Sequence, residues 1–286
     1  MASSVKSLLA ELANRGPHRV QRGDLAIVGQ SGVVYSPAEG LNLPAVAFGH
    51  GWMTNVDNYK SLLQHLASWG IVAAAPNSER GLFPSHLGLA ADLRTTLDIC
   101  VGVRLGAGGI SVHPEKLAYA GHGLGAGAAV VAAAQHLEVA AVAALFPAPT
   151  TPPSEVSAEH VAVPGLILSG TDMGAIDSNA KNLAAAWGGT AILRTIDKAT
   201  GNGLLEGRRV MSALGAGKPE KKTQSTARAL LTGFLLYTAG GDKKYKDFAD
   251  PEVEIPKTSL VDPLAEEDED SGRRSPLGQI SQLLGR

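Results

Sequence analysis

The apolar positions of the chain form short continuous runs that alternate with longer stretches of helical spacing. Continuous apolar runs occupy residues 44–48, 71–75, 117–120, 140–146, 164–170 and 190–196. Helical spacing is found near residues 55–69, 86–105, 177–187 and 224–238, and in an Ala-rich stretch that follows residue 123. Because buried parallel strands are apolar throughout and are connected by helices, this alternation predicts an α/β fold with a doubly wound, mostly parallel sheet.

The segments before this alternation predict a hairpin and a docked helix. Two apolar runs at residues 25–28 and 32–35, separated by residues 29–31, are typical of an antiparallel β-hairpin. A shared helical face is expected further upstream, formed by Leu8, Leu9, Leu12 and Ala13. We expect this face to pack on the domain, and contact with a partner or a membrane surface is the alternative.

Composition divides the chain into one domain with two extensions. We expect residues 1–22 to be a helical extension, residues 23–257 the domain, and residues 258–286 an acidic tail. The tail contains an acidic block at 266–270, which predicts disorder. Apolar spacing at 277–284 would allow one amphipathic turn that folds on a partner, although a floppy tail is the interpretation we favour.

Charge and cysteine content exclude several classes of protein. The 286 residues carry a formal charge of -2 with Lys and Arg scattered, so no nucleic-acid partner is expected. The single cysteine, Cys100, lies in an apolar helical pattern, which excludes a disulfide framework and favours a small buried side chain. We see no secretory signal and no membrane-spanning segment, and we therefore expect a cytoplasmic protein without a transmembrane segment.

One stretch, residues 117–127, combines an apolar run, a sharp turn and the start of a helix. Its centre reads Gly121-His122-Gly123-Leu124-Gly125. This order matches the nucleophile elbow G-x-S-x-G, in which the outer glycines let strand and helix pass closely. The outer glycines are present here, but glycine also occupies the nucleophile position.

Together with three further motifs, the elbow resembles the α/β-hydrolase superfamily, and within it the dienelactone-hydrolase-like and cutinase-like (polyester hydrolase) branch. The other motifs are the loop Phe48-Gly-His-Gly-Trp52, the turn Leu168-Ser-Gly-Thr-Asp172 and the late loop at residues 197–206. The resemblance covers residues 25–237, and the order and spacing of the motifs are more specific than any one of them. The Ala- and Gly-rich composition fits a GC-rich bacterial genome, and the resemblance includes actinobacterial hydrolase-like proteins.

The resemblance assigns a role to each motif. It implies an oxyanion hole formed by the backbone N–H groups of Trp52 and Leu124. It implies that Asp172 is the acid of the catalytic triad, with helix capping as its structural alternative and Asp177 as a less favoured substitute.

The two side chains that would perform the chemistry are missing. Gly123 occupies the nucleophile position, and Gly201 occupies the position of the catalytic histidine, or Asn202 if the alignment slips by one residue. The last histidine of the chain is His160, so no histidine follows Asp172 and the order Ser, Asp, His cannot be completed.

Other polar residues near these motifs do not replace the triad. We expect His122 to pack or to line the binding cleft, and His50 to fix the shape of its loop. Thr200 and Ser169 lie near the site but have no evident base. The spacing of His50, His122 and Asp172 resembles no metal motif, so we expect no metal and no other cofactor.

These observations predict a catalytically degenerate hydrolase fold, a pseudo-hydrolase, that acts as a ligand-binding or protein-scaffolding module. The expected cleft is mostly apolar and suits a small acyl or ester ligand or a peptide segment. It would be lined by Trp52, His50, His122, Leu124, Asn202 and the loop at 147–153. A protein partner would bind the N- or C-terminal extension. The alternative is an active serine ester hydrolase of the carboxylesterase or dienelactone-hydrolase type whose nucleophile position is altered or engineered.

Overall fold

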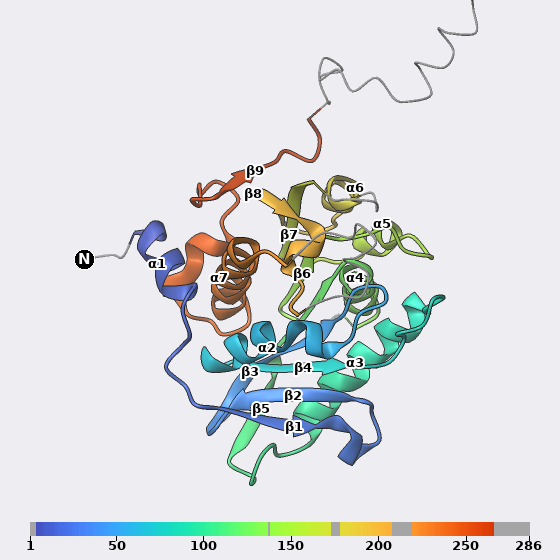
Figure 1. Cartoon of the computed structure of the whole chain (residues 1–286), viewed down its shortest axis with the longest axis vertical. Coiled ribbons are helices and arrows are strands. Elements are labelled where there is room, and N and C mark those ends of the chain that lie inside the picture. Colours follow the sequence, from blue (N-terminus) through green and yellow to red (C-terminus); the bar gives the residue numbers. More distant parts are fainter. Residues whose placement is uncertain (1–3, 137, 173–177, 208–218, 266–286) are drawn as a thin grey trace, which may run out of the picture.

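A computed structural model describes residues 4–136, 138–172, 178–207 and 219–265. These residues form one sheet of nine strands with helices on both faces (Figure 1), in the order β1-β2-β4-β3-β5-β6-β7-β8-β9. The strands are β1 (Val20–Asp24), β2 (Gly32–Pro37), β3 (Gly40–Gly49), β4 (Val72–Pro76), β5 (Ile110–His122), β6 (Ala141–Leu145), β7 (Gly165–Asp172), β8 (Ala191–Thr200) and β9 (Thr258–Leu260).

The centre of the sheet is parallel and its margins are antiparallel. Strands β4, β3, β5, β6, β7 and β8 pair in parallel, whereas β1, β2 and β9 pair antiparallel to their neighbours. This arrangement confirms the predicted doubly wound, mostly parallel α/β sheet. The parallel strands end at one common edge, where ligands bind in open α/β sheets.

Helices divide the core into two halves, one on each face of the sheet. The α-helices are α1 (Val5–Leu12), α2 (Lys60–Ser68), α3 (His86–Gly102), α4 (Leu124–Gln135), α5 (Ser154–Ala158), α6 (Ala180–Ala185) and α7 (Lys221–Thr238). Short 3-10 helices are η1 (Leu25–Val28), η2 (Val56–Tyr59), η3 (Gly201–Leu204) and η5 (Lys243–Ala249). Successive residues of β3 alternate between the halves: Val46 and Phe48 pack with α1, α2 and α7, and Ala45 and Ala47 pack with α3 and α4. Within the described residues, no helix has the length and apolar character needed to cross a membrane.

The predicted hairpin exists, but its first strand was placed wrongly. Residues 25–28 form η1, and β1 lies just before them and pairs with β2. The Asp24 carboxylate accepts a hydrogen bond from the Ala26 N–H at 2.9 Å and caps η1, which ends at Gly29 with a φ of 87°. Leu25 is buried but Ile27 is 87% exposed, so most of the apolar run that suggested a strand faces solvent.

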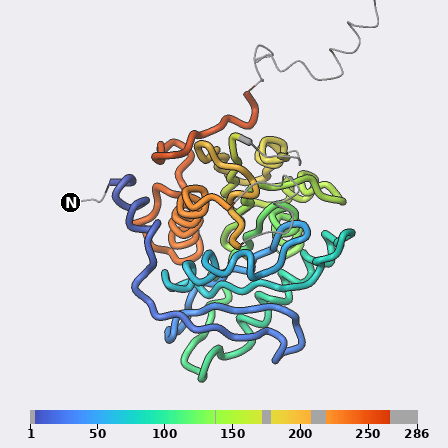
Figure 2. Tube along the Cα trace, viewed as in Figure 1, coloured from blue at the N-terminus to red at the C-terminus, as the bar shows by residue number. Residues whose placement is uncertain are grey.

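The terminal segments are more closely integrated than a domain with separate extensions would require. In Figure 2 the blue N-terminal segment lies beside the orange helix α7, and Leu8, Leu9 and Leu12 of α1 are buried, as predicted. Lys244 and Glu11 form an exposed ion pair, with 2.8 Å between Nζ and Oε1. Strand β9 lies in the expected tail but pairs with β8. The acidic block at 266–270 and the segment at 277–284 lie outside the described residues.

Two further boundaries also differ from the prediction. The segment 147–157 was expected to be a loop throughout, but its last residues begin α5. The helix expected at 177–187 is described only as α6, and Asp177 lies outside the described residues.

Cys100 is buried in α3 as a small apolar residue, as predicted. Burial raises the pKa of its thiol to about 12, so roughly one thiol in ten thousand is ionised at pH 8. We expect Cys100 to be unreactive toward Ellman's reagent in the native protein and fully reactive in urea, where unfolding exposes it. It is the chain's single cysteine, so the signal comes from this residue alone. Native-state labelling at the rate of an exposed thiol would contradict this burial.

Candidate functional site

The elbow forms a sharp turn between β5 and α4. Gly123 caps the N-terminus of α4 with φ 57° and ψ -115°, a backbone conformation that L side chains rarely adopt. Its N–H donates to the carbonyl of Leu145 at 3.0 Å, and its own carbonyl accepts from Ala148 N–H at 3.2 Å. The turn is therefore held by the next strand and by the loop that follows that strand.

The glycines on either side of the turn are required by the close passage of β3, β5 and α4. A Cβ atom at Gly121 would lie 2.0 Å from the carbonyl oxygen of Gly125. A Cβ atom at Gly125 would lie 2.2 Å from the carbonyl oxygen of Gly49. Both neighbours are backbone atoms that cannot rotate away, so any larger residue would force the strands and the helix apart.

Gly123 itself has space around it. Among the described residues, and apart from its chain neighbours, the nearest heavy atom to a Cβ at this position is Gly51 Cα at 3.8 Å, which is ordinary van der Waals contact. This distance brings the loop after β3 against the turn, as the motif spacing predicts. The described residues therefore leave room for a Cβ atom at this position of the elbow, although its positive φ is strained for any L side chain.

The resemblance assigns an oxyanion hole to two backbone amides, those of Trp52 and Leu124. Leu124 is the first residue of α4, and the first N–H groups of a helix have no acceptor within the helix. Among the described residues, neither the Leu124 N–H nor the Trp52 N–H has a hydrogen-bond acceptor. The N-terminus of α4 adds a partial positive charge, so this corner favours an anionic or strongly polar oxygen.

His122 is buried, and both of its ring nitrogens are engaged. Nε2 lies 2.9 Å from the carbonyl oxygen of Gly201, and Nδ1 lies 2.8 Å from the Tyr59 hydroxyl. A carbonyl oxygen only accepts, so Nε2 carries the hydrogen and Nδ1 accepts the Tyr59 hydrogen; this tautomer is assigned from the hydrogen-bond network. The Tyr59 oxygen in turn accepts from Gly51 N–H at 2.9 Å. His122 therefore joins the loop after β3 to η3 and does not present a basic nitrogen to a substrate.

His50 is fully buried, and both of its ring nitrogens face backbone carbonyls. Nε2 lies 2.6 Å from the oxygen of Ser78, and Nδ1 lies 2.9 Å from the oxygen of Gly51. These contacts agree with the predicted role of fixing the loop. They differ from the expectation that His50 lines an open cleft, because its ring has no exposed surface.

The expected acid and histidine positions meet at the carboxyl edge of the sheet. Asp172 ends β7 and pairs in register with Thr200 of β8, and the chain continues directly into Gly201. Gly201 is buried and Asn202 is half-buried. The structure thus places Gly123, Asp172 and Gly201, the positions that the resemblance assigns to a triad, at one edge of the sheet.

Sequence reasoning missed Glu220, which holds the late loop. Its carboxylate accepts hydrogen bonds from the Thr200 hydroxyl at 2.9 Å, from the Thr200 N–H at 3.2 Å and from the Thr223 hydroxyl at 2.6 Å. Thr200 is thereby engaged in structure, and Ser169 is likewise paired through its hydroxyl with Thr195 at 2.8 Å. Neither hydroxyl is placed on the elbow. The sequence signal that could have drawn attention to such a carboxylate is the Thr-x-x-Glu pattern of helix N-termini, in which the glutamate lies in the first turn of the helix. Glu220 does not fit this pattern, because it precedes α7.

No group of three or more His, Cys, Asp or Glu residues is arranged to hold a metal ion in the part of the chain that the structure describes. A scan against models of protein families found no match to this chain, and a search of curated proteins found none either.

Proposed function

We propose that the protein is a pseudo-hydrolase that binds the carboxylate or ester group of a small acyl ligand at the elbow and does not hydrolyse it. The observation that carries this proposal is the elbow itself. Its glycine framework keeps the close backbone passage, and its N–H groups are available, yet Gly123 supplies no nucleophile. Two backbone donors at a helix N-terminus suit the oxygen of a carboxylate or ester.

Apolar side chains beside the loop after β3 provide a place for the acyl chain. Trp52 is 40% exposed and its indole N–H donates to the carbonyl of Leu82 at 3.1 Å. Leu82 is 61% exposed and Phe83 is 97% exposed. Adjacent exposed apolar side chains of this size are typical of surfaces that bind a ligand or a partner.

The structural contacts of the two described histidines near the elbow support binding over turnover. Both ring nitrogens of His122 are hydrogen-bonded, and the ring of His50 is fully buried with its nitrogens against two backbone carbonyls. Removal of triad members leaves only the weak catalysis of the oxyanion hole and of binding. The alternative, a serine ester hydrolase with an altered nucleophile position, requires a nucleophile elsewhere.

The test removes one backbone donor. In Leu124→Pro the N–H disappears, and proline is well tolerated at the first position of a helix. A residue before proline prefers an extended conformation, and Gly123 has the mirror image of that conformation. Because glycine has no Cβ, it adopts the mirror image freely, so its conformation is compatible with a proline at position 124. We expect hexanoate to shift the Leu124 and Trp52 amide resonances of the native protein. We expect Leu124→Pro to weaken binding roughly 10-fold or more, as for loss of a hydrogen bond to a charged group.

Leu124→Ala is the matched control because it loses the same side-chain packing but keeps the N–H. It should bind hexanoate like the native chain. Equal loss in both variants, or no amide shifts with the native protein, would contradict the proposal. Native hydrolysis of p-nitrophenyl butyrate that disappears in Leu124→Pro, together with labelling by a serine-reactive phosphonate, would establish the alternative.

A further inference from the structure

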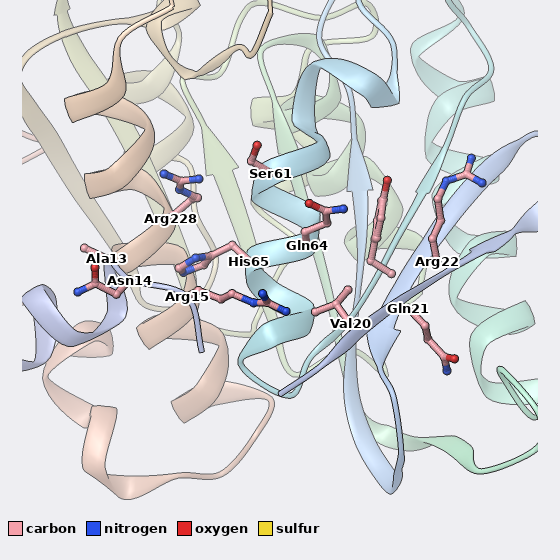
Figure 3. A pocket seen from close by; sticks show the side chains of 11 residues that line it. Ala13, Asn14, Arg15, Val20, Gln21, Arg22, Ser61, Gln64, His65 and Arg228 are labelled. Atoms are coloured by element: carbon pink, nitrogen blue, oxygen red, sulfur yellow. The ribbon is translucent and has the colours of Figure 1, made fainter. Parts of the chain in front are cut away.

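A second cavity lies away from the elbow, between β1, α2, α7 and the loop that follows α1 (Figure 3). Its volume is about 500 Å³, within the range of roughly 300–1,000 Å³ that is common for small-molecule sites. None of the elbow residues contributes to its wall. It therefore requires an explanation separate from the acyl site.

The wall of this cavity is cationic. Arg15, Arg22 and Arg228 line it from the loop after α1, from β1 and from α7, and no Asp or Glu is among its described lining residues. In the described part of the chain, none of these arginines forms a salt bridge. Like charges repel one another unless an anion lies between them, so this arrangement favours an anionic ligand.

Two buried nitrogens on this wall lack hydrogen-bond partners among the residues that the structure describes. His65 is 6% exposed, and its Nε2 has no partner; the Nε of Arg228 is also buried without one. Figure 3 shows the side chains of Arg15, His65 and Arg228 projecting from three segments into the same cavity. Buried polar atoms in proteins nearly always have a partner. These two nitrogens therefore point to a ligand that supplies hydrogen-bonding oxygens.

We propose that this cavity binds a small phosphate monoester that carries hydroxyl groups, the chemical class of the sugar phosphates. A guanidinium group matches the geometry of phosphate oxygens. Several guanidinium groups carry enough positive charge to balance a phosphate dianion, and they therefore favour it over a carboxylate, which carries one negative charge. The cavity is larger than inorganic phosphate, and Ser61, Gln64 and Asn14 offer neutral hydrogen-bonding groups for hydroxyls. The overall charge of -2 does not favour long polyanions, which supports a small ligand.

The test is calorimetric titration of the full-length native protein with glucose 6-phosphate, with inorganic phosphate and glucose as separate titrants. We expect saturable binding of glucose 6-phosphate, at least 10-fold tighter than that of inorganic phosphate. Arg228→Gln should weaken it 10-fold or more, since a charged hydrogen-bonding group is lost. Arg94→Gln, an exposed position on α3, should leave it unchanged.

Arg15→Gln serves as a second variant, because Arg15 is exposed and its substitution does not disturb the core. It should also weaken binding if Arg228→Gln does not fold. Absent binding of glucose 6-phosphate, equal affinity for inorganic phosphate, or equal effects of the Arg15 and Arg94 variants would overturn the proposal. Hexanoate binding at the elbow should persist in Arg15→Gln, so failure of one site is distinguishable from failure of the other.

Discussion

Gly121→Ala and Gly125→Ala are each expected to destabilise the fold by about 4 kcal/mol or more, enough to remove most of the stability of an ordinary domain. The added Cβ would lie 2.0 Å and 2.2 Å from carbonyl oxygens of Gly125 and Gly49, respectively. Side chains can repack around an extra methyl group at a cost of about 1–3 kcal/mol, but a strand and a helix that clash through their backbones cannot. Urea unfolding followed by circular dichroism and by the reactivity of Cys100 measures the loss.

Gly102→Ala is the matched control, because it is also a glycine-to-alanine change but has no heavy atom within 4 Å of the new Cβ. It lies in α3, where alanine is the better helix former by up to about 1 kcal/mol. Gly123→Ala should fall between these extremes, with a cost of about 1–3 kcal/mol from its positive φ alone. Stability losses at Gly121 and Gly125 no greater than at Gly102 would show that the close backbone passage is not required.

The features that were predictable from the sequence are those with local causes. The elbow was recognisable because the close passage of two backbones requires glycine at a fixed spacing. Gly121 and Gly125 occupy those positions. The parallel strands were recognisable because they are buried on both faces and hence apolar throughout. The apolar run at 25–28 was misinterpreted since apolar content alone does not reveal that Ile27 points to solvent.

The features that escaped prediction depend on contacts between distant segments. Tyr59 is 63 residues from His122 in sequence, yet its hydroxyl decides which nitrogen of that histidine carries the hydrogen. Glu220 is 20 residues from Thr200 and shapes the late loop. The cationic cavity joins Arg15 to Arg228 only after β1 and α7 are packed on α2. No spacing rule relates such pairs, because tertiary packing brings them together.

The second large effect concerns the pH dependence of stability. Burial, and secondly the charge of Arg228, lower the pKa of His65 from its ordinary 6.5 to about 4, against a smaller opposing effect of the Leu12 carbonyl. The unfolded chain therefore binds a proton more readily than the native one. The stabilising contribution of neutral His65 is complete above pH 6.5, and it falls as the pH drops toward 4. At about 1.4 kcal/mol per pH unit, we expect His65 to cost about 3 kcal/mol over this interval.

His65→Gln isolates this effect because glutamine is polar but does not titrate. The variant should match the native protein within about 1 kcal/mol at pH 7 and exceed it by about 2–3 kcal/mol near pH 4. Carboxylates elsewhere titrate in both proteins. Their contribution therefore cancels in the difference between the urea unfolding free energies of the variant and the native protein. His18→Gln, on the exposed loop before β1, should retain the native loss. Arg15 and Arg228 line the same cavity, and no carboxylate is among its described lining residues. A difference between His65→Gln and the native protein that stays constant with pH would mean that folding does not lower the pKa of His65, and would contradict the prediction.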